Sequence, residues 1–412
     1  MGFEAWDQFP ASPVAPRQRG RYDLLGFLEQ EGAMAEADRR GIIGQPRRVL
    51  VKVGSNVLTD QAGRVDARRI RSLADQVSTL FDEGREVIVV SSGAIATGLG
   101  ELELEARPTT MPALQAIAAV GQGRLIRMYK QAFRRRGRRV GQVLLSREDM
   151  EDRGRFLNTR NTLRALLRYG CVPIINENDT VCVDEIRYGD NDFLAAHLAT
   201  TIMADLVVLL TTVDGLMQPD ERGRQRRVPA VKWISEEVLG LDDGGTSPRG
   251  TGGMTSKLRA ASYVTRAGVP VVVANGKRRD ALLRVVGGED VGTLFLPAAR
   301  RMASRKRWIG FTAPAKGCLV VDEGARRALV ERGKSLLASG IREVRGTFDQ
   351  GDVVALKVAG GEPFAQGLTN YSSDELERIR GCHTREIEAR LGYKDYDEAI
   401  HRDNLVVLLT SA

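Results

Sequence analysis

A lysine interrupts an apolar stretch early in the chain, in Val51-Lys52-Val53-Gly54-Ser55-Asn56. Burying an unpaired ammonium group is costly, so we expect Lys52 to have an anionic partner. Gly54 and Ser55 follow at once, and there the backbone N–H groups could approach phosphate oxygens. The segment therefore indicates a phosphate site, although a lysine at the edge of a sheet would give the same pattern.

A second lysine ends a glycine-rich segment, Gly250-Thr251-Gly252-Gly253-Met254-Thr255-Ser256-Lys257, which is expected to open a helix. It matches neither the P-loop pattern nor GxGxxG. Its physical logic is the same, because glycines allow close backbone approach and N-terminal helix amides bind phosphate. Lys257 would add a movable positive charge. A flexible glycine-rich loop without a ligand is the alternative.

Three more polar segments, Ser91–Ile95, Asn176–Asp179 and Gly189–Asp192, follow predicted strands or open predicted helices. A small-residue turn at the start of a helix can bind an anion. Asp179 could bind an ammonium group. Ordinary helix capping is the alternative for Gly189–Asp192, but three consecutive cap-type residues exceed what one cap needs.

The elements that must position these segments can be read from hydrophobic periodicity. Short apolar runs predict strands at Val49–Val53, Val87–Val90, Val140–Leu145, Val172–Ile175, Leu206–Leu210 and Val269–Ala274. Amphipathic patterns predict helices at Asp66–Glu83, Pro112–Arg136 (weakened by Gly121 and Gly123), Arg155–Tyr169, Asp192–Ala204 and Thr255–Ala267. This alternation is typical of an α/β domain whose mostly parallel sheet is sandwiched by helices. Ligands of such sheets bind beyond the carboxyl ends of the strands, so the polar segments should meet there.

The predicted α/β domain covers residues 46–300. Residues 1–45 are proline-containing and weakly periodic, and we expect a mobile extension; translation could start at Met1 or Met34. A basic segment, Arg300 to Arg307, follows this domain. In residues 305–412 the pattern changes to short apolar runs with glycines between them, which predicts a small β-rich domain. Its expected elements are strands at Leu319–Val321, Leu336–Leu337, Glu343–Val344, Val353–Lys357 and Phe364–Leu368, and a helix at Glu323–Arg332.

Composition excludes several classes of protein. No apolar run reaches the roughly 18–20 residues of a membrane span, and the N-terminus lacks a signal-peptide pattern, so we expect a cytoplasmic protein. The four cysteines form no CxxC pair. A net charge of +8 favours anionic partners in general. The arginine run from Arg134 to Arg139 could bind nucleic acid, but a solvated helix end is the favoured interpretation.

Taken together and in this order, the five segments resemble the motifs of the glutamate 5-kinases, a branch of the amino-acid-kinase family. The resemblance runs from about Pro46 to the C-terminus, and the part beyond Arg305 is similar to a PUA domain. The matching motifs are SGAI at Ser92–Ile95, NEND at Asn176–Asp179, GDND at Gly189–Asp192, the GTGGM-type loop at Gly250–Lys257, and the stretches Met150–Arg153 and Arg155–Asn158.

The resemblance implies an activity and a role for individual residues. The activity is ATP-dependent phosphorylation of the side-chain carboxylate of L-glutamate, the first step of proline biosynthesis. Ser92, Asp179 and Asn191 would bind glutamate, while Lys52, Lys257 and Asp192 would be catalytic, with Asp192 organising the two lysines. The residues that would bind ATP are Lys52, Thr211, Thr212, Thr251, Gly252, Gly253, Met254, Thr255, Ser256 and Lys257. Mg²⁺ would bridge the phosphates, with no metal ligand from the protein.

One position departs from the family pattern. Glutamate 5-kinases have Leu-Thr-Asp after the strand that here ends at Leu210, and this chain has Thr212 in place of the aspartate.

The resemblance also implies a homo-oligomer and feedback inhibition by proline.

Two other functions stay open from the sequence. One is a sibling kinase that acts on aspartate, acetylglutamate, carbamate or UMP. The other is an RNA-binding protein that works through the PUA-like domain, since PUA domains bind RNA in other proteins. The carboxylate acceptor of the favoured reaction has an ordinary pKa of about 4.3 and needs no general base. This agrees with three histidines, His197, His383 and His401, that lie outside the motifs.

Overall fold

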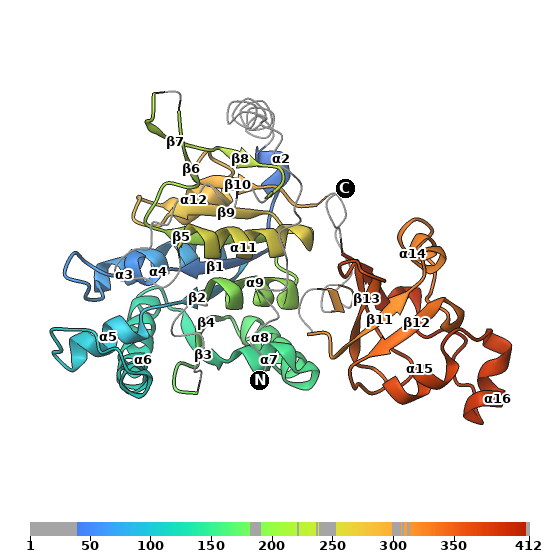
Figure 1. The fold of residues 1–412 in the computed structure, drawn as a ribbon. Helices are drawn as coiled ribbons and strands as arrows, with labels where there is room; N and C mark the ends of the chain where they lie inside the picture. The colour runs from blue at the N-terminus through green and yellow to red at the C-terminus, as the bar shows by residue number, and fades with distance from the viewer. Residues whose placement is uncertain are drawn as a thin grey trace.

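The computed structural model describes residues 39–181, 191–220, 222–235, 238, 253–298, 306, 309–310 and 314–408. Its larger domain is built on an eight-stranded sheet (Figure 1). In spatial order the strands are β3 (Arg139–Leu145), β4 (Cys171–Glu177), β2 (Glu86–Ser91), β1 (Arg48–Val53), β5 (Leu206–Thr211), β9 (Val271–Asn275), β10 (Thr293–Phe295) and β8 (Ala230–Val231). The predicted strands are all present, but the three-residue β10 and two-residue β8 were not predicted, because runs so short carry no periodicity.

The strands from β3 to β9 pair in parallel, and β10 is antiparallel to β9. The prediction of a mostly parallel sheet is therefore confirmed. β1 lies at the centre, with Lys52 opposite Val90 on one side and Leu209 on the other. Beyond β5 a short hairpin, β6 (Met217–Pro219) and β7 (Gln225–Arg227), leaves the sheet; it too was not predicted.

Helices cover both faces of this sheet. On one face lie α4 (Ala67–Asp82), α6 (Met111–Arg134) and α12 (Ala281–Val286), and on the other α7 (Arg147–Glu151), α8 (Arg153–Arg168), α9 (Asn191–Ile202) and α11 (Met254–Arg266). Successive side chains of a strand point to opposite faces. Val51 and Val53 accordingly pack in the α4 core, and Leu50 packs in the α9 core. Lys52 shares the face of Leu50.

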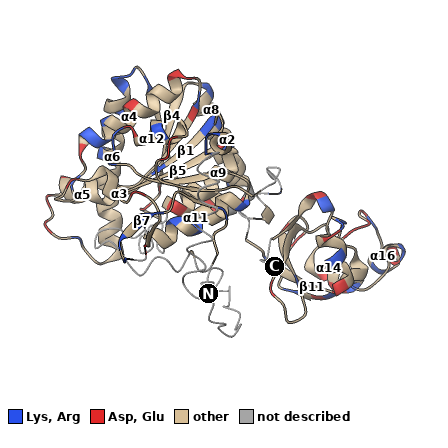
Figure 2. Cartoon of the chain, turned by 90° about the horizontal axis from the view of Figure 1, so that it is seen from above, with Lys and Arg blue, Asp and Glu red and all other residues tan. Residues whose placement is uncertain are grey.

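The helix boundaries follow from local chemistry. The carboxylate of Asp66 caps α4 by accepting the backbone N–H of Arg68, as short acidic residues do at helix starts. The helix ends before Gly84, which has a φ of +80°. Basic and acidic residues are interspersed over the outer helices (Figure 2). Within the described residues, no helix combines the length and apolarity that crossing a membrane requires.

The smaller domain has a five-stranded sheet and its own core. Its strand order is β12 (Ile341–Arg345), β11 (Gly317–Val321), β13 (Val353–Val358), β14 (Ala365–Leu368) and β15 (Leu405–Val407), and its helices are α14 (Glu323–Val330), α15 (Ser373–Ile379) and α16 (Ile387–Leu391). The predicted strand at Leu336–Leu337 is wrong, since Leu336 makes only a single bridge with Ile400. That residue is buried, which explains its apolar character without a strand. The elements after β14, none of which is predicted from the sequence, close this domain.

The two domains touch through the start of α8. Phe156 is buried with Ile309, Val353, Leu368 and Val406, and Leu157 packs against them. The predicted domain boundaries at residues 300 and 305 stay predictions, because most residues between 299 and 313 lie outside the described part of the chain. The boundary at residue 45 stays a prediction as well, and the described end of the predicted extension forms a helix with buried residues at Arg39–Ile43.

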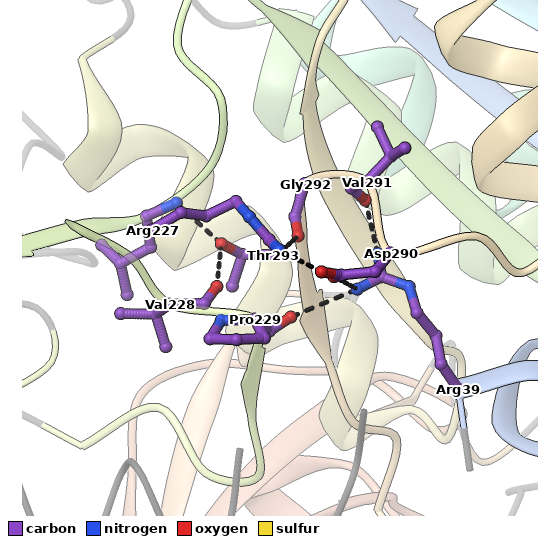
Figure 3. Close-up of polar contacts among 9 residues, drawn as sticks. Arg39, Arg227, Val228, Pro229, Asp290, Val291, Gly292 and Thr293 are labelled. Carbon is purple, nitrogen blue, oxygen red and sulfur yellow. Dashed lines mark hydrogen bonds and ion pairs between the residues drawn. The ribbon is translucent and has the colours of Figure 1, made fainter. Parts of the chain in front are cut away.

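A buried arginine fastens the first described helix, α2 (Arg39–Ile43), to the far edge of the sheet (Figure 3). The guanidinium of Arg39 donates to the carbonyls of Pro229 (3.3 Å) and Val291 (2.5 Å) and pairs with Asp290 at 3.3 Å. Its side chain is only 3% exposed. Arg227 contacts Asp290 and the carbonyl of Gly292 from the other side. These residues join α2, β7 and β10.

We therefore expect Arg39→Ala to lower the free energy of unfolding of the α/β domain by about 1–3 kcal/mol, because two partly buried carbonyls lose their charged donor. Its neighbour Arg40 is exposed and provides the control, for which a change within about 0.5 kcal/mol is expected. Urea unfolding followed by circular dichroism measures both. Equal effects of the two variants would show that the buried contacts contribute nothing.

Candidate active site

Two lysines from different elements share one buried carboxylate at the carboxyl edge of the sheet. Nζ of Lys52 in β1 lies 2.5 Å from Oδ1 of Asp192, and Nζ of Lys257 lies 3.2 Å from Oδ2. Asp192 is fully buried, and the lysines are 4% and 5% exposed. The anionic partner expected for Lys52 is thus Asp192.

The charge balance of this cluster is one carboxylate against two ammonium groups. Burial alone would raise the pKa of Asp192, but the charges and hydrogen bonds of Lys52 and Lys257 outweigh it and hold that pKa below its ordinary value. Asp192 therefore stays ionised. The cluster carries an excess of one positive charge in a site almost closed to water, which suits it to an anionic ligand.

Two helix starts supply the carboxylate and one of the lysines. Asp192 lies in the first turn of α9, and Lys257 lies in the first turn of α11, which begins after Gly253. Nζ of Lys257 also donates to the carbonyl of Gly253 at 3.2 Å, and Oγ of Ser256 donates to Asp192 at 3.2 Å. Backbone N–H groups at the start of α11 are available to an anion, as at any helix N-terminus.

A chain of side-chain amides lies beside the lysine cluster. Nδ2 of Asn191 donates to Oγ of Ser92 and to Oδ1 of Asn176, both at 3.1 Å. Nδ2 of Asn176 in turn donates to Oε1 of Gln122 at 2.8 Å. Oδ1 of Asn191 is buried and has no partner among the described residues. Because the other hydrogen bonds fix the orientation of Asn191, this oxygen is left as an acceptor for a ligand.

The polar segment that ends at Asp179 lies directly after β4. Asp179 is half-buried, and burial raises the pKa of its carboxyl to about 6, although the charge of Arg107 acts in the opposite direction. A carboxylate in such a site gains from a cationic ligand.

The remaining predicted residues lie nearby or outside the described chain. Thr211 is the last residue of β5, its carbonyl accepts the N–H of Gly276 at 2.9 Å, and Thr212 follows with its side chain exposed. Met254 and Thr255 open α11. Five predicted or motif residues, Gly189, Asp190, Gly250, Thr251 and Gly252, lie outside the described residues.

Gln122 has no role in the site predicted from the sequence, and Asn176 belongs to it only as part of the NEND motif. Gln122 lies inside the long helix α6, where nothing local distinguishes it from a surface glutamine. Asn176 is 2% exposed, so it is a buried amide that needs partners. The one available signal was its place at the end of an apolar strand.

The site has the groups that phosphoryl transfer to an anionic acceptor needs, and such a transfer requires no general base. Of the described residues, no group of three or more His, Cys, Asp or Glu could hold a metal ion. His197, on the same helix as Asp192, is buried against Tyr263 with 4.5 Å between ring centroids. Burial lowers the pKa of His197 to about 3, so it stays neutral.

Comparisons with known proteins agree with this geometry. The amino acid kinase family model matches residues 47–275, and the PUA domain model matches residues 317–391. The chain is 48% identical to the glutamate 5-kinase of Syntrophotalea carbinolica over 90% of its own length and 99% of that protein. It is also 48% identical to the glutamate 5-kinase of Caldanaerobacter subterraneus, over 88% and 98%, and 46% identical to that of Geobacter sulfurreducens, over 90% and 100%. The chain therefore belongs to the amino acid kinase family, in its glutamate 5-kinase branch, and carries a C-terminal PUA domain.

Proposed function

We propose that this protein transfers the γ-phosphoryl group of ATP to the side-chain carboxylate of L-glutamate, giving L-glutamyl 5-phosphate and ADP as the first step of proline biosynthesis. The observation that carries the proposal is the buried Lys52–Asp192–Lys257 cluster beside the Ser92–Asn191 pair. The family membership supports the choice of substrates.

In this proposal the amide chain and Asp179 hold glutamate. Oδ1 of Asn191, buried and without a described partner, would accept a hydrogen bond from the α-ammonium group, and Asp179 would balance its charge. Ser92, at the start of α5 (Ala94–Glu101), would contact a glutamate carboxylate. Gln122 and Asn176 would act as positioning residues, since they reach the ligand only through Asn191.

ATP would lie along the carboxyl edge of the sheet, between the end of β5 and the start of α11. Thr211 and Thr212 would contact the nucleoside part, and the loop from Thr251 to Lys257, including Gly252 and Gly253, would hold the phosphates through backbone N–H groups. The same edge carries Lys52, so both substrates would meet where the two lysines lie.

The reaction forms a bond between a glutamate carboxylate oxygen and the γ-phosphorus while the bond to the β-phosphate oxygen breaks. The acceptor is already ionised, so the barrier comes from an anion that approaches an anion. Lys52 and Lys257 would neutralise the transferred group and the leaving oxygen. Asp192 keeps both ammonium groups in place.

Mg²⁺ fits this site as a partner of the phosphates rather than of the protein. The described residues offer a single carboxylate at the cluster, and it already binds two lysines. Mg²⁺ commonly keeps several waters and takes its other ligands from substrate phosphates. When bound it would neutralise phosphate charge. Homo-oligomer formation, inhibition by proline, RNA binding by the PUA domain and a cytoplasmic location stay predictions.

The direct test is ADP release by the purified protein with ATP and one acceptor at a time. We expect turnover with L-glutamate and at most a few per cent of that rate with L-aspartate, N-acetyl-L-glutamate, carbamate or UMP. A higher rate with one of these acceptors would assign the chain to a sibling activity.

The raised pKa of Asp179 gives a pH prediction. Below pH 6 its carboxyl is protonated in the free enzyme and cannot balance the ammonium group of glutamate, so kcat/KM for glutamate should fall about tenfold per pH unit under this value. Above pH 6 the profile should be flat. Asp179→Asn should have a lower kcat/KM than the wild type above pH 6 and no bend near pH 6. A bend that persists in the variant would belong to another group.

The threonine at position 212 predicts weaker ATP binding than an aspartate would give. A neutral hydroxyl contact is worth ~1 kcal/mol and a charged one ~1.5–3 kcal/mol. The difference of ~0.5–2 kcal/mol means that Thr212→Asp should lower KM for ATP by roughly two- to thirtyfold and leave kcat nearly unchanged. Initial rates at saturating glutamate measure both constants. An unchanged or higher KM would show that another residue makes this contact.

A further inference from the structure

A cavity of about 250 Å³ lies on the face of the sheet opposite to the lysine cluster. It is enclosed by the ends of β1 and β5, by α3 (Ser55–Leu58), by α4, and by the turn between β9 and α12. Val53 lines it, whereas the adjacent Lys52 points to the other face, where Asp192 lies. The strand alternation therefore separates this cavity from the proposed catalytic face.

The floor of the cavity is apolar and its polar groups are satisfied. Apolar side chains of both neighbouring strands and helices form most of it: Val53, Val57, Leu58, Leu73, Leu210 and Leu282. The amide of Gln76 is already engaged, because its nitrogen donates to the carbonyl of Ser72 at 3.2 Å and its oxygen accepts the N–H of Leu282 at 2.9 Å. The floor thus suits a hydrocarbon group and offers little to a polar one.

The mouth of the cavity is basic. Arg69, Lys277, Arg278 and Arg279 line it, and none of the described lining residues is acidic. Arg278 pairs with Asp214 at 2.7 Å and Arg279 with Asp280 at 3.3 Å. In the described chain neither Arg69 nor Lys277 has an ion pair, and a guanidinium nitrogen of Arg69 donates to the carbonyl of Lys277 at 3.1 Å. This bond holds Arg69 and Lys277, the two lining residues without an ion pair in the described chain, together at one rim.

The backbone around the cavity is fixed by close contacts. The N–H of Gly54 donates to the carbonyl of Leu210 at 3.1 Å, and a Cβ on Gly276 would come within 2.7 Å of Val57 and 3.0 Å of Leu210. The walls of the cavity are therefore held in place by the packed backbone at the edge of the sheet.

We propose that this cavity is a second binding site, for a small organic anion that carries one phosphate or carboxylate group on an apolar body of about ring size. The volume lies just under the ~300–1,000 Å³ of sites for drug-sized ligands, so a smaller molecule fits. The anionic group would lie between Arg69 and Lys277, and the apolar body would cover Leu73 and Leu282. Inorganic phosphate alone would leave the floor empty. The proposal does not depend on the reaction proposed above.

The test uses 4-fluorophenyl phosphate as the probe, followed by fluorine NMR on the full chain with saturating ADP, which keeps the nucleotide site occupied. We expect saturable binding, at least tenfold tighter than that of the uncharged 4-fluorobenzyl alcohol. Lys277→Gln should weaken it about tenfold through loss of the charged contact. Ser72→Trp, which places a bulky side chain at the mouth, should abolish it. Arg71 is exposed on the same helix and does not line the cavity, so Arg71→Gln should bind the probe like the wild type.

Circular dichroism and unfolding midpoints establish that each variant is folded, so that a loss of probe binding cannot result from unfolding. Saturable binding that both folded variants reduce and Arg71→Gln does not would support the site. No binding in the millimolar range with ADP present, equal binding of the alcohol, or unchanged binding in both variants would each overturn it.

Discussion

Lys257→Ala is expected to lower kcat by about 100-fold or more and to change KM for glutamate by much less. The ammonium group of Lys257 lies in a nearly closed site and would act on charge that develops during transfer. Such preorganised charges contribute on the order of 3 kcal/mol to the transition state, which corresponds to about two powers of ten in rate. The variant keeps a partner for Asp192, since Lys52 remains 2.5 Å from its Oδ1. The fold should therefore survive the substitution.

The measurement is steady-state kinetics with ATP and glutamate varied in turn, together with an unfolding curve for each protein. Lys130 is an exposed lysine on α6 that belongs to neither the lysine cluster nor the amide chain, and Lys130→Ala should retain wild-type rates. A Lys257→Ala protein that is folded, turns over at the wild-type rate and only binds its substrates less tightly would exclude a role in the transition state.

The convergence of this site could be predicted from the sequence because parallel strands end at one edge. Lys52 follows an apolar run, and the segments at Ser92 and Asn176 follow two others, so their meeting needs only the topology. The partner of Lys52 could be predicted as an anion but not identified, since Asp192 is 140 residues away and is brought close by the packing of α9.

Other features could not be predicted because their signal is not local. Gln122 acts through a bond to Asn176 from a helix of ordinary pattern. The strand β15 pairs with β14 across an intervening helical segment, and its three residues are too few for a period. The predicted strand at Leu336–Leu337 fails for a different reason, because burial explains the apolar character of Leu336 without a strand, while Leu337 is exposed.

Helix α6 contains two glycines, Gly121 and Gly123, that have opposite effects on its stability in the folded protein. Each glycine weakens a helix relative to alanine by roughly 0.5–1 kcal/mol, and the sequence does not distinguish Gly121 from Gly123. In the structure Gly121 is buried where α6 crosses α5, whereas Gly123 is exposed. A Cβ on Gly121 would lie 1.9 Å from the carbonyl oxygen of Ala94 and 2.3 Å from the backbone nitrogen of Gly98. A Cβ on Gly123 would meet no atom within 4 Å.

Gly121→Ala should therefore destabilise the α/β domain by about 3 kcal/mol or more, at the upper end of overpacking costs, because backbone atoms rather than flexible side chains obstruct the methyl group. Gly123→Ala should stabilise it by about 0.5–1 kcal/mol. Urea midpoints of the two single variants and the wild type measure the contrast. A loss of less than about 1 kcal/mol in Gly121→Ala would mean that the helices can separate at little cost.

Gly121→Ala should also change the geometry of the proposed active site. Helix α5 begins directly after Ser92 and Gly93, and Gly93 has a φ of +114° that a displaced turn would have to change. A shift of α5 away from α6 would move Ser92 relative to Asn191, which now donates to it at 3.1 Å. In the fraction that stays folded, Gly121→Ala should raise KM for glutamate several-fold while KM for ATP changes little. The Gly123→Ala protein should keep both constants, because its methyl group points to solvent. If both variants showed the same kinetics, the α5–α6 crossing would have no part in positioning Ser92.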